Sequence, residues 1–446
     1  MSHYRRHHKI MGREEAKELL TFIEKSPSCY HVIQNLKKEL ATEGFKEVYE
    51  GKPWVLEEGG RYYVSRNGSS LIAFKVPGRT FKGFQIISSH SDSPSFKVKE
   101  NPEIEVEQQY VKLNVEKYGG MLYAPWFDRP LSVAGRILIK EGNQIQTKLV
   151  NINRDLMLIP NLAIHLNRKV NEGYVYNAQE DMLPLFGDAA AKGTFIKILA
   201  ENARVQEESI IGSDLFLYNR MKGTFWGANE EYISSTKLDD LQCVFTSFNG
   251  FLAGSHPENV SVCCVLDNEE VGSTTRQGAA STFLKDTLMR ISGEMEKSES
   301  EHLMALDTSF MISADNAHGV HPNYAVKTDP TNRPFLNQGI VIKYSANQKY
   351  TTDGVTAALF KLICEKAEVP FQTYMNRSDI EGGSTLGNIS NTQVAVNSVD
   401  IGLAQLAMHS PYETAGVRDT YYMRKAAETF YNSNICAIQS GGYTLT

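Results

Sequence analysis

The chain has 446 residues, of which 41% are hydrophobic and 22% charged, an ordinary composition for a globular protein. Its formal net charge of −6 argues against a nucleic-acid or anionic-membrane surface, and no apolar run approaches the roughly 18 residues of a spanning helix. Chains of this length outgrow a single hydrophobic core, so two domains are expected. Residues 1–9 are basic and polar, and we expect them to form a leader outside the domains, with minor metal candidates in its histidines.

The first part of the chain mixes helical and strand-like patterns. Apolar residues at helical spacing predict helices at 13–25 and 30–40, and short β-rich runs predict strands at 71–76 and 84–88. From about residue 99 to 224 the pattern changes to alternating strand-like runs with few helical stretches. This change marks a β-rich block.

After Asp239 helices alternate with strands again. The predicted elements are, in order, a helix at 241–252, a strand ending at Asp267, a helix at 282–291, a strand ending at Asp315, a strand at 339–343, a helix at 355–368, strands at 372–375 and 393–399, and a helix at 418–435. Helices alternating with buried strands predict an α/β sandwich.

Three acids follow the apolar run at 260–266, namely Asp267, Glu269 and Glu270. Neighbouring carboxylates at the end of a buried strand are costly without a cation. The carboxyl edge of an open α/β sheet is also where ligands bind. One glutamate could bind a metal while the other handles protons. We therefore predict a catalytic metal site.

Four other elements also end in a histidine or an acid. They contribute His90 with Asp92 two residues later on the same strand face, the pair Asp239-Asp240 before a helix, Asp315, and His409. Taken singly, each has a structural alternative: Asp239-Asp240 as a helix N-cap, Asp315-Asn316 as a turn, and His409 as a core or surface histidine. All five groups at element ends point together to one shared site.

The candidate ligands stand on both sides of the β-rich block, because His90 precedes it and the others follow it. We therefore interpret residues 99–225 as a β-rich domain inserted into a discontinuous catalytic domain formed by residues 1–98 and 226–446. The six cysteines show no CxxC or framework spacing, which favours core thiols and a reducing, cytoplasmic location.

Seven ordered motifs carry these residues: His90-Ser-Asp92-Ser-Pro94, Trp126-Phe-Asp128-Arg129-Pro-Leu, Ile159-Pro-Asn-Leu-Ala-Ile-His165-Leu, Lys237-Leu-Asp239-Asp240-Leu, Asp267-Asn-Glu269-Glu270-Val-Gly-Ser273, Ser313-Ala-Asp315-Asn-Ala-His-Gly-Val-His-Pro-Asn-Tyr324 and Met408-His409-Ser410. Over nearly the full length they resemble the aspartyl aminopeptidase family of dinuclear zinc exopeptidases. The resemblance implies a three-layer phosphorylase/hydrolase-like catalytic domain, an inserted β-rich dimerisation domain, and homodimers that assemble into a tetrahedral homododecamer acting on small peptides.

The resemblance also assigns roles to single residues. It implies two divalent metal ions, which the nitrogen and oxygen ligands would suit as zinc, with cobalt or manganese as alternatives. The implied ligands are Asp239 bridging both ions, His90 and Asp315 on one, and Glu270 and His409 on the other. Glu269 would be the general base, with Asp92 orienting His90.

Two further residues are assigned by resemblance. His165 would reach the partner's active site from the dimerisation domain, with a structural histidine as the alternative. Lys343 would neutralise an acidic N-terminal side chain of the substrate, with a solvated lysine as the alternative. The chain departs from the family at Asn161 and at Asp240, and the second change would add negative charge near the metals.

Rival functions remain open at this point. The same scaffold could cleave neutral or apolar N-terminal residues, or act as a carboxypeptidase or deacylase with Arg377 binding a terminal carboxylate. It could also be an inactive self-assembling scaffold, or hold a metal that is only structural. The complete ligand set and the spare Glu269 favour an active enzyme over a scaffold, and the resemblance at Lys343 slightly favours acidic N-terminal residues.

Overall fold

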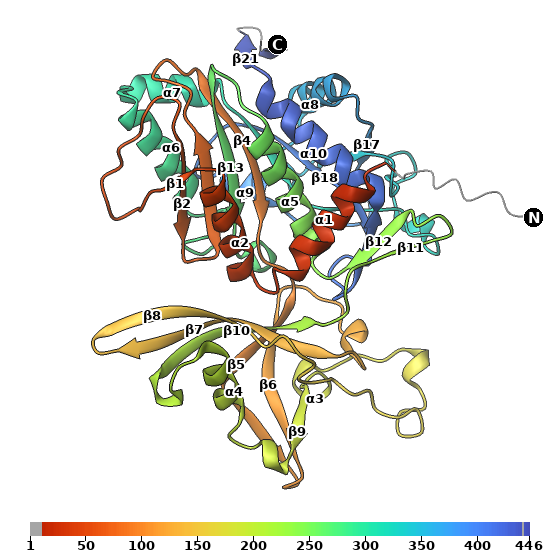
Figure 1. Ribbon diagram of the computed structural model, residues 1–446. Coiled ribbons are helices and arrows are strands. Elements are labelled where there is room, and N and C mark those ends of the chain that lie inside the picture. The colour runs from red at the N-terminus through yellow and green to blue at the C-terminus, as the bar shows by residue number, and fades with distance from the viewer. Residues whose placement is uncertain (1–10, 439–440) are drawn as a thin grey trace, which may run out of the picture.

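A computed structural model describes residues 11–438 and 441–446, so the basic leader lies outside the described residues. Its largest element is a nine-stranded sheet (Figure 1). In spatial order the strands are β1 (Lys46–Glu47), β2 (Arg61–Arg66), β3 (Ser70–Lys75), β13 (Asn259–Leu266), β4 (Gly83–His90), β14 (Phe310–Ala314), β18 (Asn397–Gly402), β16 (Ile340–Lys343) and β17 (Phe371–Tyr374).

Helices cover both faces of this sheet. One face packs against α1 (Arg13–Glu24), α2 (Cys29–Thr42), α5 (Leu238–Ala253), α8 (Gly354–Ala367) and α10 (Val417–Asn432). The other packs against α6 (Phe283–Glu294), α7 (Glu299–Asp307) and α9 (Leu386–Ser390). The result is the predicted three-layer α/β arrangement, with one hydrophobic core on each side of the sheet.

The central strands show why their sequences lack alternation. Neighbouring residues of β4, Ile86 and Ile87, belong to opposite cores, and Val262 and Cys263 of β13 divide in the same way. Because both faces are covered, every position of these strands is apolar or buried. The strands β13, β4, β14 and β18 run parallel, so their carboxyl ends meet at one edge.

A separate six-stranded antiparallel sheet lies below the α/β layers in Figure 1. Its strands, in spatial order, are β8 (Gln144–Asn151), β7 (Leu131–Glu141), β10 (Ile210–Asn219), β5 (Ser95–Val106), β6 (Tyr110–Tyr118) and β9 (Leu185–Asp188). It has its own core, to which α4 (Phe195–Ala203) contributes, and α3 (Ala178–Asp181) lies nearby. The β-rich region is thereby shown, while the exact domain boundaries stay a prediction.

A five-stranded sheet lies close to the ligand-bearing edge. It is formed by β11 (Thr224–Trp226), β12 (Tyr232–Ser235), β20 (Glu413–Gly416), β19 (Ala404–Leu406) and β15 (Ala317–His318). The segment between β19 and β20 carries His409. The last strands, β21 (Ile435–Ile438) and β22 (Gly442–Leu445), pair with each other.

Three element predictions need correction. The strand predicted at 393–399 begins only at Asn397, because Val394 and Val396 enter the core from irregular backbone after α9. The last helix ends at Asn432 and not at residue 435, because strand β21 already begins at Ile435. Helix α7 was not predicted, because it buries only Ala305 and so lacks an apolar stripe; Ser298 and Glu301 form a capping box at its start. No helix in the described part of the chain is long and apolar enough to cross a membrane.

Candidate metal centre

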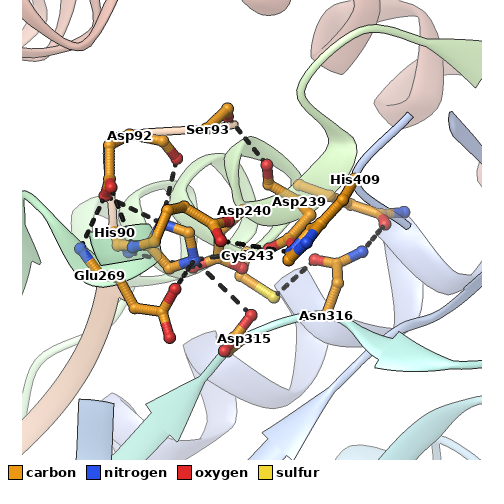
Figure 2. Close-up of polar contacts among 12 residues, drawn as sticks. His90, Asp92, Ser93, Asp239, Asp240, Cys243, Glu269, Asp315, Asn316 and His409 are labelled. Carbon is orange, nitrogen blue, oxygen red and sulfur yellow. Dashed lines mark hydrogen bonds and ion pairs between the residues drawn. The ribbon is translucent and has the colours of Figure 1, made fainter. Parts of the chain in front are cut away.

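The carboxyl edge of the main sheet gathers seven histidine and acid side chains from distant parts of the chain. Figure 2 labels all of them except Glu270. They come from the end of β4, the start of α5, the turns after β13 and β14, and the β19–β20 connection: His90, Asp239, Asp240, Glu269, Glu270, Asp315 and His409. Parallel strands that end at one edge explain how residues more than 300 positions apart in the chain meet.

Two of the three groups of potential ligands in the cluster share Asp239; the third is formed by His90, Glu269 and Glu270. On one side, His90 Nε2 lies 3.4 Å from Asp239 Oδ1 and 3.6 Å from Asp315 Oδ1. On the other, His409 Nε2 lies 3.3 Å from Asp239 Oδ2 and 3.2 Å from Glu270 Oε2. The two oxygens of one carboxylate therefore face different histidines, as a bridging ligand would require.

Charge and burial make this arrangement unfavourable by itself. Burial raises the pKa of Glu269 to about 8, and the carboxylates of Asp315 and Asp239 raise it too, against the opposing effect of His90. Burial raises the pKa of Glu270 as well, and Asp239 adds to the shift. Burial opposes ionisation of Asp239 also, but contacts with His409 and His90 keep its pKa below the usual range. Positive charge therefore stabilises the cluster.

Unsatisfied atoms point to metal ions as that charge. Among the described residues, four buried atoms of the cluster have no hydrogen-bond partner: His90 Nε2, Asp239 Oδ1, Asp240 Oδ1 and Glu270 Oε1. Buried polar atoms without partners are rare in folded proteins. Imidazole nitrogens and carboxylate oxygens without thiolates suit zinc and related divalent ions, so the residues present fit such a group.

Asp92 fixes the orientation of His90. Its carbonyl oxygen lies 3.0 Å and its Oδ1 3.2 Å from His90 Nδ1. Because a carbonyl can only accept, Nδ1 carries the hydrogen and Nε2 turns to the cluster. Asp92 also accepts from the backbone N–H groups of Glu269 and Glu270, at 3.2 and 3.1 Å. One carboxylate thus positions three of the seven side chains.

Two residues that support the cluster, Glu413 and Tyr118, were not recognised from the sequence, and Asp240 makes a contact that the sequence did not indicate. Glu413, 2% exposed, accepts from the backbone N–H of Asp239 at 2.9 Å and from that of His409 at 2.8 Å. Tyr118 of β6 donates to Asp92 Oδ2 at 2.8 Å. Asp240, predicted only as added charge, accepts from the backbone N–H of His90 at 3.0 Å. No motif near Glu413 or Tyr118 marks them, because their role depends on contacts across the fold.

The N-cap alternative for the Asp239-Asp240 pair is wrong. Lys237 occupies the N-cap position of α5, and neither aspartate has helical backbone angles. Both side chains are buried, with exposures of 2% and 0%. The two carboxylates point into the cluster and not along the helix end (Figure 2).

Lys343 lies behind the cluster at the end of β16. Its side chain is 2% exposed, so the alternative of a solvated lysine is wrong. The amine donates to the carbonyl of Asp315 at 2.8 Å and to that of Asn316 at 3.4 Å, and it lies over the Tyr350 ring. An ammonium has three donors, so one remains for another partner. Its role in substrate binding stays a prediction.

The structure does not bring His165 or Arg377 to the cluster. His165 is exposed in a turn of the β-rich region, outside every group of potential ligands found in the described residues. Arg377 forms an ion pair with Asp379, at 2.8 Å, on the surface. Within one chain neither residue reaches the centre, so a role for His165 requires a second subunit.

An α/β sandwich with buried histidines and carboxylates at the carboxyl edge of its parallel strands defines a metallohydrolase type of centre. The family profile described as aminopeptidase I zinc metalloprotease (M18) matches residues 22–431. The chain belongs to this family, which confirms the family predicted from the motifs.

Individual relatives agree along the whole chain. A protein of Clostridium novyi named probable M18 family aminopeptidase 2 is 47% identical, covering 94% of this chain and 98% of its own. Among solved structures, a chain in the cryo-EM structure of the Ape4 and Nbr1 complex superposes with a TM-score of 0.91 at 34% identity, over 95% of this chain and 87% of that one. A chain of the mApe1 dodecamer of S. cerevisiae superposes with a TM-score of 0.82 at 28% identity, over 94% of this chain and 96% of that one.

The double contact of Glu413 leads to a prediction. Glu413→Gln keeps the shape but replaces one acceptor oxygen by a donor, so one of the two backbone N–H groups loses its partner. We expect metal affinity to fall by about 10- to 100-fold, as for other groups that orient ligands. Titration with zinc under competition from a chelator measures this.

Asp419→Asn is the matched control. Asp419 is also fully buried and also accepts two backbone N–H groups, from Asn337 and Gly339, but it is not part of the cluster. Its substitution should lower stability and leave metal affinity unchanged. Equal metal loss in both variants would show that Glu413 acts only through general stability.

Proposed function

We propose that this protein is a dinuclear metallo-aminopeptidase that releases N-terminal residues from small peptides. Membership of the M18 family supports metallo-aminopeptidase activity. The observation that carries the dinuclear centre is Asp239, whose two oxygens face His90 on one side and His409 on the other. Glu269, next to Glu270 and close to His90, supplies an acid–base group beside these ligands.

The proposed ligand sets divide the cluster. His90 and Asp315 would hold one ion, Glu270 and His409 the other, and Asp239 both. Bound divalent ions, which we propose to be zinc, would supply Lewis acidity and an activated water for attack on the peptide carbonyl. Asp240 adds a fourth carboxylate near His90, where it accepts from the backbone.

Proton transfer falls to Glu269. Its carboxylate lies 3.7 Å from His90 Nε2 and is partly buried, which keeps its proton affinity high: burial raises its pKa to about 8. A carboxylate in this position can take a proton from the attacking water and return it to the leaving amine. Asp92 holds the Glu269 backbone, and so keeps the base in place.

Specificity for acidic N-terminal residues is the finer part of the proposal. Lys343 is buried beside Asp315, and one ammonium donor remains for a substrate carboxylate. A preference for neutral or apolar residues is the alternative, since two carbonyls already accept two of the three donors of the amine. We place the acidic preference slightly ahead.

Assembly and location complete the proposal. A related chain forms the mApe1 dodecamer, so we propose a homodimer that assembles into a homododecamer, with His165 entering the partner's centre. The strongly exposed side chains around it, Leu162, Ile164 and Leu166, are consistent with an interface. All six cysteines are free, which supports a reducing, cytoplasmic location.

The base assignment is tested by Glu269→Gln. The substitution keeps the shape and removes proton transfer, so kcat should fall by at least about 10²-fold while both metals remain bound. Metal content and turnover are measured on the same preparation. Glu270→Gln is the comparison, since this substitution should lower the metal content itself. Near-normal turnover of the Glu269→Gln variant would contradict the base assignment.

The specificity assignment is tested by Lys343→Met. Removing the charge should lower the ratio of kcat/KM for Asp over Leu substrates by at least about tenfold, since a buried charge pair is lost. The ratio is the measurement because any displacement of Asp315 affects both substrates equally. A wild-type enzyme that already prefers Leu, or an unchanged ratio in the variant, removes Lys343 as the selector.

The role of His165 is tested by mixing two inactive chains. His165→Ala and Glu269→Gln subunits, dissociated and reassembled together, form some centres that contain both intact residues if His165 acts on the partner. Activity should then return in mixed assemblies, which differently tagged chains identify. If assemblies shown to contain both chains have no activity, His165 does not act at the centre of the partner subunit.

A further inference from the structure

Residues 118–122 of the β-rich region form a short segment that reaches the metal centre. The segment begins with Tyr118, the last residue of β6. Tyr118 pairs with Ser95 of β5, and its ring lies 5.4 Å from that of Phe216 on β10, measured between the ring centroids. Trp126, which follows the segment, is buried in the core of the six-stranded sheet. Both ends of the segment are therefore anchored in the β-rich sheet.

The hydroxyl of Tyr118 fixes the carboxylate of Asp92. It donates to Asp92 Oδ2 at 2.8 Å and accepts from Asn268 Nδ2 at 2.9 Å. The amide of Asn268 can face only this way, because its oxygen accepts from Thr275 and from Gln277, both at 2.8 Å. The single hydrogen of the hydroxyl is thus directed to Asp92. Through that carboxylate the β-rich region acts on the histidine at the end of β4.

The next residue, Gly119, packs directly against the ligand Glu270. Its φ is +80°, in the left-handed region that favours glycine. A Cβ at this position would meet the Cβ of Glu270 at 3.1 Å and its carbonyl oxygen at 3.2 Å. Glycine is therefore required here for its conformation and for its size. The backbone of the segment limits where Glu270 can lie.

His409 contacts the same segment through its backbone and its ring. Its carbonyl oxygen accepts from the backbone N–H of Leu122 at 3.2 Å. Burial lowers the pKa of His409, and Asp239 first and then the backbone of Gly120 raise it to about 9, so Gly120 lies against the ring. The φ of His409 is +68°, which residues other than glycine keep only where their surroundings hold them. The segment is part of those surroundings.

Three proposed ligands, taken from both ligand sets, depend on this one segment. His90 depends on it through Asp92, and Glu270 and His409 depend on it by direct contact. These ligands stand on separate parts of the α/β layers, namely β4, the turn after β13 and the β19–β20 connection. A shift of the β-rich sheet would therefore displace ligands of both ions at once.

We propose that residues 118–122 are a positioning segment, through which the β-rich region holds the ligands of both ions in place. Metal affinity then depends on the position of that region within the same chain. Because coupling is reciprocal, bound metal also holds the segment. The inference rests on the proposed ligand sets and needs neither the acidic specificity nor the assembly.

Tyr118→Phe tests the contact with Asp92, since it removes the hydroxyl and keeps the ring. We expect zinc affinity to fall by about 10- to 100-fold, the usual effect of losing a group that orients ligands. Competition with a chelator measures the affinity. Tyr218→Phe is the matched control: Tyr218 lies on β10 of the same sheet and donates to Asn151 at 2.6 Å, away from the centre. Its substitution should leave zinc affinity unchanged.

Gly119→Ala tests the contact with Glu270. The added methyl group pushes against a ligand, so zinc affinity should again fall by at least about tenfold. Gly142→Ala is the matched control, because Gly142 also has a positive φ, of +60°, but a Cβ there would meet no atom of the described residues within 4 Å. Both variants carry the same kind of backbone strain. Only the first should lose metal.

Cobalt spectra separate positioning from a general loss of stability. At saturating cobalt, the visible absorption of the loaded protein reports the geometry of its ligands. We expect this spectrum to change in Tyr118→Phe and Gly119→Ala and to stay that of the wild type in Tyr218→Phe and Gly142→Ala. A variant that was only less stable would bind with the wild-type spectrum. Thermal unfolding checks that all four variants are folded.

Amide hydrogen exchange on the wild type tests the reciprocal effect. Zinc should slow exchange in peptides that contain residues 119–122 by at least about tenfold, because the amide of Leu122 donates to the backbone of a ligand. Exchange in the turn between β7 and β8 should not change. If Gly119→Ala does not fold, Tyr118→Phe and this measurement still decide.

Wild-type zinc affinity and cobalt spectra in both variants of the segment overturn the proposal, as does exchange at residues 119–122 that zinc leaves unchanged. A wild type that binds zinc but cleaves no peptide would contradict the proposed function alone. The metal affinities, spectra and exchange rates do not depend on turnover, so the two failures are distinguished.

Discussion

Concentrated negative charge in a buried place is the constraint on which this structure depends. Five carboxylates surround two histidines at the edge of the main sheet. Burial and mutual repulsion raise the pKa of Glu269 and Glu270, and several buried atoms there lack partners. Such an arrangement is costly without cations and favourable with them. The stability of the edge and the chemistry of the centre therefore have the same cause.

The fold meets this constraint by using backbone donors as well as ions. Asp92 accepts from two N–H groups of the Glu269-Glu270 turn, and Glu413 accepts from those of Asp239 and His409. A carboxylate that accepts backbone hydrogen bonds fixes the position of a neighbouring ligand without competing for the metal. The centre is therefore held by a second set of acids that lie outside the proposed ligand sets.

The β-rich region contributes to the same centre in two ways. Tyr118 of β6 reaches Asp92 within the chain, and β-strands of this region line a cavity of about 280 Å³ together with the N-terminus of α2. His165, by contrast, is exposed and far from the centre in its own chain, so its proposed role belongs to an assembly.

Local sequence was sufficient for the α/β class, most helices and strands, and the acids and histidines at their ends, because periodicity and strand-end composition are properties of neighbouring residues. His90, Asp315 and the Glu269-Glu270 pair were found in this way. The sequence could not show that Lys343 is buried, or that Glu413 accepts from the backbone of both Asp239 and His409. Those properties depend on segments separated by long stretches of chain, and only the packing of β-strands, helices and the inserted sheet decides which of their charges meet.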